Sequence, residues 1–276
     1  MEGGLEERFR QGLQLAEAEY HHPDCENSDA ADACRSFCFH HHQPTEQAFL
    51  LIHGFTACPY EMRELGQLLF SRGHNVFGVR LAGHGTTVTD LAKTTGAHWE
   101  ASAQAGLAIA TSLGRKVTVI GESMGGALAV LLALSRQELI HGLILCAPCF
   151  EIANPLARLA RWPLIRVAVP QTDMGVALEW QRQYWYEKIP TKAVAELVAL
   201  AGRARKAAPA IHIPTLLIQA KDDRIVRWQG AQRFFERLAS SEKALKLFEP
   251  GHHNLTIDLN PQKQQVFNWI FDFILK

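Results

Sequence analysis

The chain has 276 residues, of which 47% are hydrophobic and 20% are charged, and its 28 Lys and Arg residues balance 28 Asp and Glu residues. This composition is typical of a globular protein with a sizeable core, and the balanced charge excludes a strong field that would attract nucleic acid or acidic partners. No apolar run is long enough to cross a bilayer, and the N-terminus has neither a basic start nor an apolar run after it, so we expect a soluble cytoplasmic protein without a signal peptide.

Strand-like and helix-like runs alternate from about residue 47 onward. The predicted strands are residues 49–53, 76–80, 117–120, 142–146, 214–220 and 244–248, and the predicted helices are 62–72, 99–113, the run from Gly126 and 262–275. This alternation is typical of an α/β protein with a mostly parallel sheet that has helices on both faces. The first forty-odd residues are less regular, and we expect them to form a leading helix and an antiparallel edge hairpin.

One block interrupts the alternation, because no convincing strand lies between Cys149 and Ile213. Residues 150–212 are therefore interpreted as a helical cap, inserted between an N-terminal part of the core (1–149) and a C-terminal part (213–276). Much of the chain's large aromatic content falls in this block: Trp162, Trp180, Tyr184, Trp185 and Tyr186. These side chains suit either an apolar acyl pocket or packing of the cap on the core.

Within the block, residues 152–172 combine an apolar stripe with arginines and contain no acid. The apolar positions Leu156, Leu159, Trp162 and Ile165 recur every three residues, and Arg158, Arg161 and Arg166 flank them. An ordinary cap helix explains this pattern, although Pro163 interrupts it. The alternative is a weak contact with a membrane surface that collects a lipophilic substrate.

The six cysteines are predicted to stay reduced, because the chain is long and carries no export signal. The spacing of Cys146 and Cys149 matches a redox motif, but the pair follows a strand-like run instead of opening a helix, so a redox role is not favoured. Cys34, Cys38 and the histidines 40–42, with Cys25 upstream, match no common zinc spacing and are interpreted as a surface hairpin. No metal or cofactor is expected.

The most informative motif is Gly-Glu-Ser-Met-Gly at residues 121–125. It joins a β-branched run to a helix-forming run, and small residues on both sides of Ser123 suit a tight strand-to-helix turn that presents a nucleophile. The helix start behind it offers free backbone N–H groups to an oxyanion.

A serine nucleophile needs a base and an orienting acid, which in this architecture follow it in the order Ser, acid, His, each after a strand. The strand ending near Ala220 is followed by Asp222 and Asp223, and the strand ending near Phe248 is followed by His252 and His253. Position alone leaves both pairs open.

Four ordered motifs resemble the α/β-hydrolase superfamily, and within it the bacterial carboxylesterases and monoacylglycerol lipases. They are Leu-Ile-His-Gly-Phe-Thr at 51–56, Gly-His-Asn-Val at 73–76, Leu-Ala-Gly-His-Gly at 81–85 and Gly-Glu-Ser-Met-Gly-Gly at 121–126. The resemblance covers roughly residues 45–150 and 210–276.

The resemblance also implies which member of each pair acts. Family members have Val or Ile two residues after the acid, which favours Asp223, and a Thr and an Asp after the histidine, which Thr256 and Asp258 supply for His253. The chain departs from the family in one respect, since the family Gly directly precedes its histidine and here Gly251 precedes His252. The family pattern assigns the oxyanion hole to the backbone N–H groups of Phe55 and Met124.

The chain is therefore expected to be a serine hydrolase that cleaves small-molecule carboxylic esters with an apolar acyl group through an acyl-enzyme. Thioesterases, acyltransferases and carbon–carbon bond hydrolases share the triad, and a catalytically idle binding protein is the reading of a different class. No nucleic-acid partner is expected, and the oligomeric state is not readable from the sequence.

Overall fold

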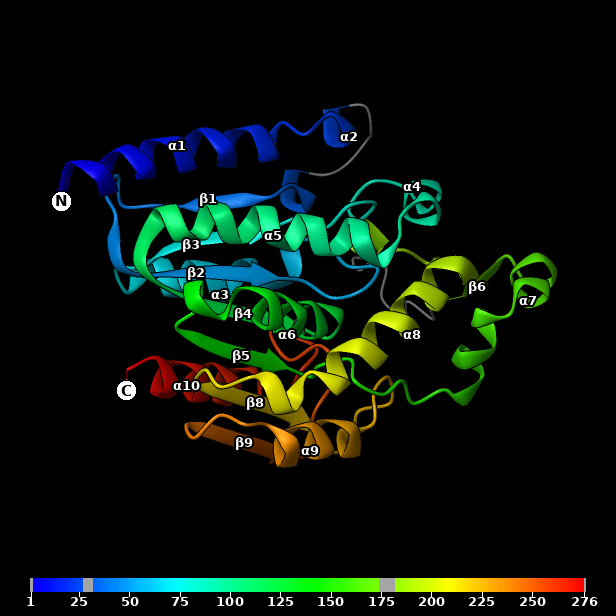
Figure 1. The fold of residues 1–276 in the computed structure, drawn as a ribbon. Coiled ribbons are helices and arrows are strands. Elements are labelled where there is room, and N and C mark those ends of the chain that lie inside the picture. Colours follow the sequence, from blue (N-terminus) through cyan, green and yellow to red (C-terminus); the bar gives the residue numbers. More distant parts are fainter. Residues whose placement is uncertain (1, 27–31, 174–181, 276) are drawn as a thin grey trace.

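The computed structural model describes residues 2–26, 32–173 and 182–275, and its centre is a seven-stranded sheet with the order β1-β3-β2-β4-β5-β8-β9 (Figure 1). The strands are β1 (Phe37–Phe39), β2 (Thr45–Ile52), β3 (Asn75–Val79), β4 (Gly114–Glu122), β5 (Gly142–Cys146), β8 (Thr215–Ala220) and β9 (Lys243–Phe248). All neighbouring pairs are parallel except β1 and β3. The predicted mostly parallel α/β architecture is confirmed.

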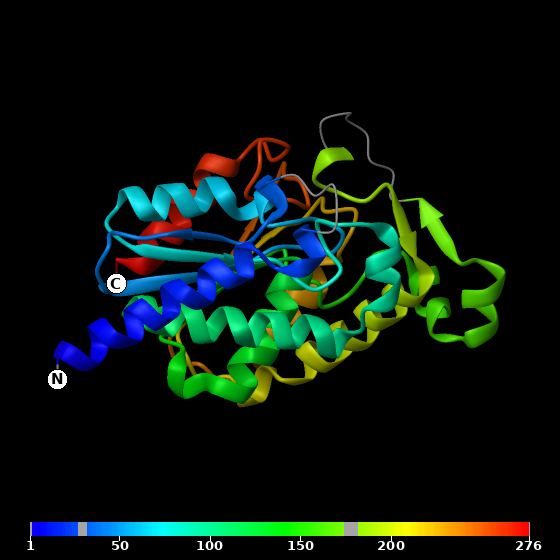
Figure 2. The ribbon, with the colours of Figure 1, turned by 90° about the horizontal axis from the view of Figure 1, so that it is seen from above.

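Alternating strand residues face two separate hydrophobic clusters, as the period of two in a strand requires. In β2, Leu50 and Ile52 belong to one cluster, and Phe49 and Leu51 belong to the other. The first face is covered by α1 (Glu2–Tyr20), α5 (Gly96–Leu113), α6 (Met124–Arg136), α8 (Thr191–Lys206) and α9 (Trp228–Arg237). The second is covered by α3 (Tyr60–Ser71) and α10 (Lys263–Ile274). Figure 2 shows α1 lying along α5, so the leading helix belongs to the first layer.

The expected edge hairpin is only partly correct. β1 is an antiparallel edge strand, but it pairs with β3, with Phe37 opposite Gly78, and not with the strand that follows it in the chain. The reason is that β2 lies inside the sheet between β3 and β4, so the free edge belongs to β3. The Phe37 ring occupies the space that a Cβ atom at Gly78 would need, with its nearest ring carbon 2.2 Å from that position.

The block between β5 and β8, called the insertion below, contains more than helices. Besides η3 (Pro155–Arg161), α7 (Pro163–Ala168), α8 and η5 (Ala208–Ala210), it holds two antiparallel strands, β6 (Gln171–Asp173) and β7 (Lys188–Pro190). The expectation of no strand here was wrong, because three-residue strands are too short to show a period. One face of α8 joins the core of the sheet, whereas α7 lies far from it (Figure 1).

The aromatic side chains of the insertion divide between packing and exposure. Tyr184 stacks on Tyr60 of α3 at 3.7 Å between ring centroids, and Trp185 is 8% exposed. The Tyr186 hydroxyl donates to the Gly83 carbonyl at 2.9 Å. Trp162, by contrast, is 66% exposed, and Trp180 lies outside the described residues. Packing on the core therefore accounts for the aromatic run 184–186.

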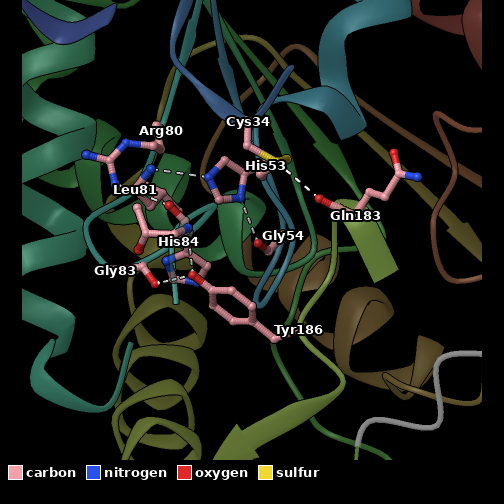
Figure 3. The surroundings of a disulfide bond; sticks show 11 residues. Cys34, His53, Gly54, Arg80, Leu81, Gly83, His84, Gln183 and Tyr186 are labelled. Atoms are coloured by element: carbon pink, nitrogen blue, oxygen red, sulfur yellow. Dashed lines mark hydrogen bonds between the residues drawn. A yellow bond between two sulfur atoms is a disulfide. The ribbon is translucent and has the colours of Figure 1, made fainter. Parts of the chain in front are cut away.

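Cys34 and Cys58 form a disulfide, so the prediction that all six cysteines stay reduced was wrong (Figure 3). Their Cα atoms are 5.0 Å apart, inside the usual range for a disulfide. The bond joins the segment before β1 to the loop after β2, and only the folded sheet brings these two segments together. The prediction failed because it rested on chain length and the missing export signal. Neither of these indicates whether two cysteines lie close together in the fold.

The Cys146 and Cys149 pair lacks the environment of a redox motif. Cys146 and Cys149 are buried at the end of β5, and burial raises the pKa of the Cys149 thiol to about 12, so the thiolate that a redox motif needs is disfavoured. In the Cys/His segment, His41 stacks on Phe70 with 4.2 Å between ring centroids.

No helix in the described part of the chain is both long and apolar enough to cross a membrane.

Candidate active site

Ser123 occupies the one-residue turn between β4 and α6. Its φ is positive, at 53° with ψ −113°, which is uncommon for a residue with a side chain. Two glycines make the turn possible. A Cβ atom at Gly121 would lie 2.2 Å from the Gly125 carbonyl oxygen, and one at Gly125 would lie 2.1 Å from the Ile52 carbonyl oxygen. The strand, the turn and the helix can approach this closely only where both flanking residues are glycine.

The structure brings Ser123, His253 and Asp223 into one chain of hydrogen bonds. The distance from Ser123 Oγ to His253 Nε2 is 2.8 Å, and the distance from His253 Nδ1 to Asp223 Oδ2 is also 2.8 Å. Because a carboxylate only accepts, Nδ1 carries the proton, and Nε2 of the neutral ring is left to accept from the serine hydroxyl. The Asp223 side chain is fully buried and that of His253 is 9% exposed. Each residue follows the C-terminal end of a strand.

The Asp223 carboxylate is held by more than the histidine. Its Oδ1 accepts from the backbone N–H groups of Ile225 (2.8 Å) and Val226 (3.0 Å), and its Oδ2 also accepts from Gln219 Nε2 at 2.9 Å. Burial acts to raise the pKa of Asp223, but the charge of His253 and the hydrogen bonds outweigh it, and the pKa is lowered. The acid is therefore ionised at neutral pH. Sequence reasoning missed Gln219, which reads as an ordinary residue of an apolar strand.

The structure also separates the members of each open pair. Asp222 is exposed and accepts from the Gly251 backbone N–H at 3.0 and 3.1 Å, so it fixes the loop that carries the histidine. His252 Nδ1 accepts from the Asn254 backbone N–H at 3.1 Å. It is Asp223 and His253 that form the hydrogen-bond chain with Ser123.

His53 shapes the loop that holds Phe55. Its Nδ1 donates to the Gly54 carbonyl at 2.8 Å, and its Nε2 accepts from the Leu81 backbone N–H at 3.2 Å (Figure 3). These two partners set the neutral tautomer, and burial, with the nearby His84, lowers the pKa of His53 well below its usual value. No hydrogen bond from the backbone N–H of Phe55 or Met124 to any described residue is present. Both predicted oxyanion donors thus remain available to a ligand.

A cavity of about 690 Å³ lies between η3 and α8. Its walls include Phe150, Trp162 and the arginines Arg158, Arg161 and Arg205. The residues of the hydrogen-bond chain do not line it, but Cys149, next to Phe150, donates its N–H to the Ser123 carbonyl at 2.9 Å. One wall of the cavity is therefore joined to the backbone of Ser123.

Comparison with known proteins agrees with this architecture. Residues 43–260 match the family described as serine aminopeptidase S33. The chain is 28% identical to a thermostable monoacylglycerol lipase of Bacillus sp. (strain H-257), over 76% of this chain and 83% of the relative. It is 24% identical to a carboxylesterase of Bacillus subtilis (strain 168), over 84% and 93%.

Solved structures give the same fold. One from a study of LipS and LipT, two metagenome-derived lipolytic enzymes, superposes with a TM-score of 0.79 at 25% identity and covers 88% of this chain and 97% of its own. A monoacylglycerol lipase of Paleococcus ferrophilus superposes with a TM-score of 0.70 at 20% identity, over 86% and 96%. The chain thus belongs to the serine aminopeptidase S33 family and is an enzyme of the α/β-hydrolase superfamily.

Proposed function

We propose that this protein is a serine hydrolase of the carboxylesterase or monoacylglycerol lipase type. The observation that carries the proposal is the chain of two 2.8 Å contacts from Ser123 through His253 to the buried Asp223. The names of the bacterial relatives, a lipase and a carboxylesterase, support an ester as substrate.

The mechanism follows from this geometry. His253 takes the Ser123 proton as the hydroxyl oxygen attacks the ester carbonyl, and Asp223 stabilises the imidazolium that forms. The oxyanion accepts from the N–H groups of Phe55 and Met124, each worth about 3 kcal/mol in the transition state. His253 then protonates the leaving alcohol, which leaves an acyl-enzyme on Ser123. A water molecule activated by His253 releases the acid and restores the serine.

The insertion, residues 150–212, is proposed as the cap that selects the substrate, with residues 1–149 and 213–276 as the two parts of the core. It follows β5 at the sheet end where Ser123 lies, and α8 anchors it to the core. The proposed substrate is a small ester with an apolar acyl group. The aromatic content of the insertion leads us to expect short to medium acyl chains.

A weak contact with a membrane surface is proposed for η3 and α7. Trp162, Leu164 and Val167 are 66, 79 and 82% exposed, and Arg158, Arg161 and Arg166 lie among them. An apolar surface bordered by cations suits an anionic lipid bilayer. Flotation with phosphatidylglycerol vesicles at low salt tests this contact. Leu164→Ser should reduce flotation, whereas the control Leu139→Ser, on an exposed surface of η2 (Gln137–Leu139), should not. No flotation of the unaltered protein ends this part of the proposal.

Substitution of the nucleophile tests the main proposal. Ser123→Ala should abolish hydrolysis of p-nitrophenyl esters and labelling by a fluorophosphonate without lowering the melting temperature. A folded Ser123→Ala variant that still turns over ester refutes the assignment, and an unaltered protein that neither labels nor hydrolyses favours an idle binding protein. Matched thioesters and an aminoacyl p-nitroanilide, chosen because of the family's name, show which acyl bond is preferred.

A cytoplasmic location stays a prediction, and the Cys34–Cys58 disulfide bears against it because such bonds persist mainly in oxidising compartments.

A further inference from the structure

Two carboxylates, Glu61 and Glu122, are buried beside the site without a cation. Glu61 is 1% exposed and Glu122 is fully buried. Among the described residues neither forms an ion pair with Lys or Arg. Burying carboxyl groups without a counter-charge is costly, so their hydrogen-bond partners must account for them.

The Glu61 carboxylate connects two loops that are far apart in the sequence. Its Oε2 accepts from the Gly54 backbone N–H at 2.6 Å, and its Oε1 accepts from Asn254 Nδ2 at 2.6 Å. Gly54 directly precedes Phe55, the proposed oxyanion donor, and Asn254 directly follows His253, the proposed base. One side chain therefore spans the two groups that must approach the same substrate carbonyl.

Glu122 holds the histidine loop one residue further along. Its Oε1 accepts from the Leu255 backbone N–H, and its Oε2 contacts Thr256 Oγ1, which is also 3.0 Å from the Glu61 carbonyl oxygen. A hydroxyl has one hydrogen, so both Thr256 contacts are satisfied only if Glu122 is protonated and donates. Burial and the neighbouring Glu61 raise the pKa of Glu122 well above its usual value, which agrees with that state.

We propose that Glu61 is a positioning residue that fixes the Phe55 amide and the His253 imidazole relative to one another through Gly54 and Asn254. Glu61 touches no reacting atom, and the inference rests on the proposed ester hydrolysis. A displacement of about 1 Å between such groups costs roughly 100-fold in rate, so the link bears on kcat more than on KM.

Three variants separate the hydrogen-bond link from the charge and from simple burial. Glu61→Ala removes both bonds, together with a hydrogen bond from the Trp185 side chain. Glu61→Gln keeps both if Asn254 turns its amide, because the new side chain can accept from Gly54 and donate to Asn254 Oδ1. Asn254→Ala breaks the link from the partly exposed loop and leaves Glu61 in place. The matched control is Glu64→Ala, an exposed carboxylate on the same helix that pairs with Lys263.

The test is p-nitrophenyl ester kinetics on the full chain, well below every melting temperature. Glu61→Ala should lower kcat about 100-fold with KM changed less than threefold, Asn254→Ala about 10-fold or more, and Glu61→Gln and Glu64→Ala less than fivefold. The double variant Glu61→Ala/Asn254→Ala should be no slower than Glu61→Ala alone, since both break one link.

Several outcomes overturn the inference. One is an unchanged kcat in folded Glu61→Ala, and another is a double variant in which the two losses multiply. Glu61→Gln falling as far as Glu61→Ala would show that charge, not position, matters. If Glu61→Ala does not fold, an unchanged kcat in Asn254→Ala still refutes the link. If the unaltered protein neither hydrolyses esters nor is labelled by a fluorophosphonate, the proposed function is refuted instead.

Discussion

Reduction of the Cys34–Cys58 disulfide should destabilise the protein by about 3.5 kcal/mol. The bonded residues are 24 positions apart, and closing a loop of that length removes conformational entropy from the unfolded chain worth about 3.5 kcal/mol at 25 °C. The entropy of unfolding is roughly 2 cal/mol/K per residue, or about 0.6 kcal/mol/K for this chain, so the melting temperature should fall by about 6 °C.

Urea unfolding with and without the reductant TCEP measures this loss. The double variant Cys34→Ala/Cys58→Ala should be insensitive to TCEP, which separates reduction of this bond from any other effect of the reductant. Thiol titration of the denatured, unreduced protein should find four thiols, those of the cysteines outside the disulfide: Cys25, Cys38, Cys146 and Cys149. Six free thiols, or a transition that TCEP does not shift, would refute the reasoning.

Two further predictions concern the acid and a buried histidine. Asp223→Asn should lower kcat for ester hydrolysis about 10⁴-fold, because the amide no longer holds the His253 tautomer. The neighbouring Asp222→Asn should lower kcat only a few-fold. Equal losses of kcat in the two variants would contradict the assignment of Asp223. Burial lowers the pKa of His84 to about 4, below its unfolded value of about 6.5. The unfolded chain therefore binds more protons between these values, so His84 leaves stability unaffected above pH 6.5 and reduces it as the pH falls to 4, by up to about 3 kcal/mol. Urea midpoints at pH 7 and 4.5 should show a smaller acid loss in His84→Gln, and an equal loss would contradict this account.

The catalytic candidates were predictable because their surroundings are regular. Each follows a strand that reads as a buried apolar run, and parallel strands bring their C-terminal ends to one edge of the sheet. The choice between neighbours was not available from position, because Asp222 and Asp223 differ only in the direction of their side chains, and so do His252 and His253. Before the fold was known, only the family resemblance favoured one member of each pair, and the folded loops show that Asp223 and His253 are the ones in the hydrogen-bond chain with Ser123.

The supporting polar residues escaped prediction for a different reason. Glu61 and Gln219 lie in segments whose pattern is otherwise that of an amphipathic helix and a buried strand, and their partners are 193 and four residues away. The position of Glu122 directly before Ser123 was a signal in the sequence, but the hydrogen-bond partners of Glu122 lie beyond residue 250. For Glu61, Glu122 and the Cys34–Cys58 pair, partners so far apart in the sequence are chosen by the fold, whereas Gln219 meets Asp223 through the loop directly after β8.

The pairing of β1 with β3 has a consequence for solubility. An open strand edge can pair with another chain, and proteins block such edges with short strands, lysines or covering segments. At one end of this sheet, β9 carries Lys243 and Lys246. At the other, three-residue β1 covers β3, and it lies in the segment before residue 43 that the family match does not include. Removing that segment would expose the backbone of β3 and the surface at Gly78 that the Phe37 ring covers, so a shortened chain should self-associate even where its serine remains reactive.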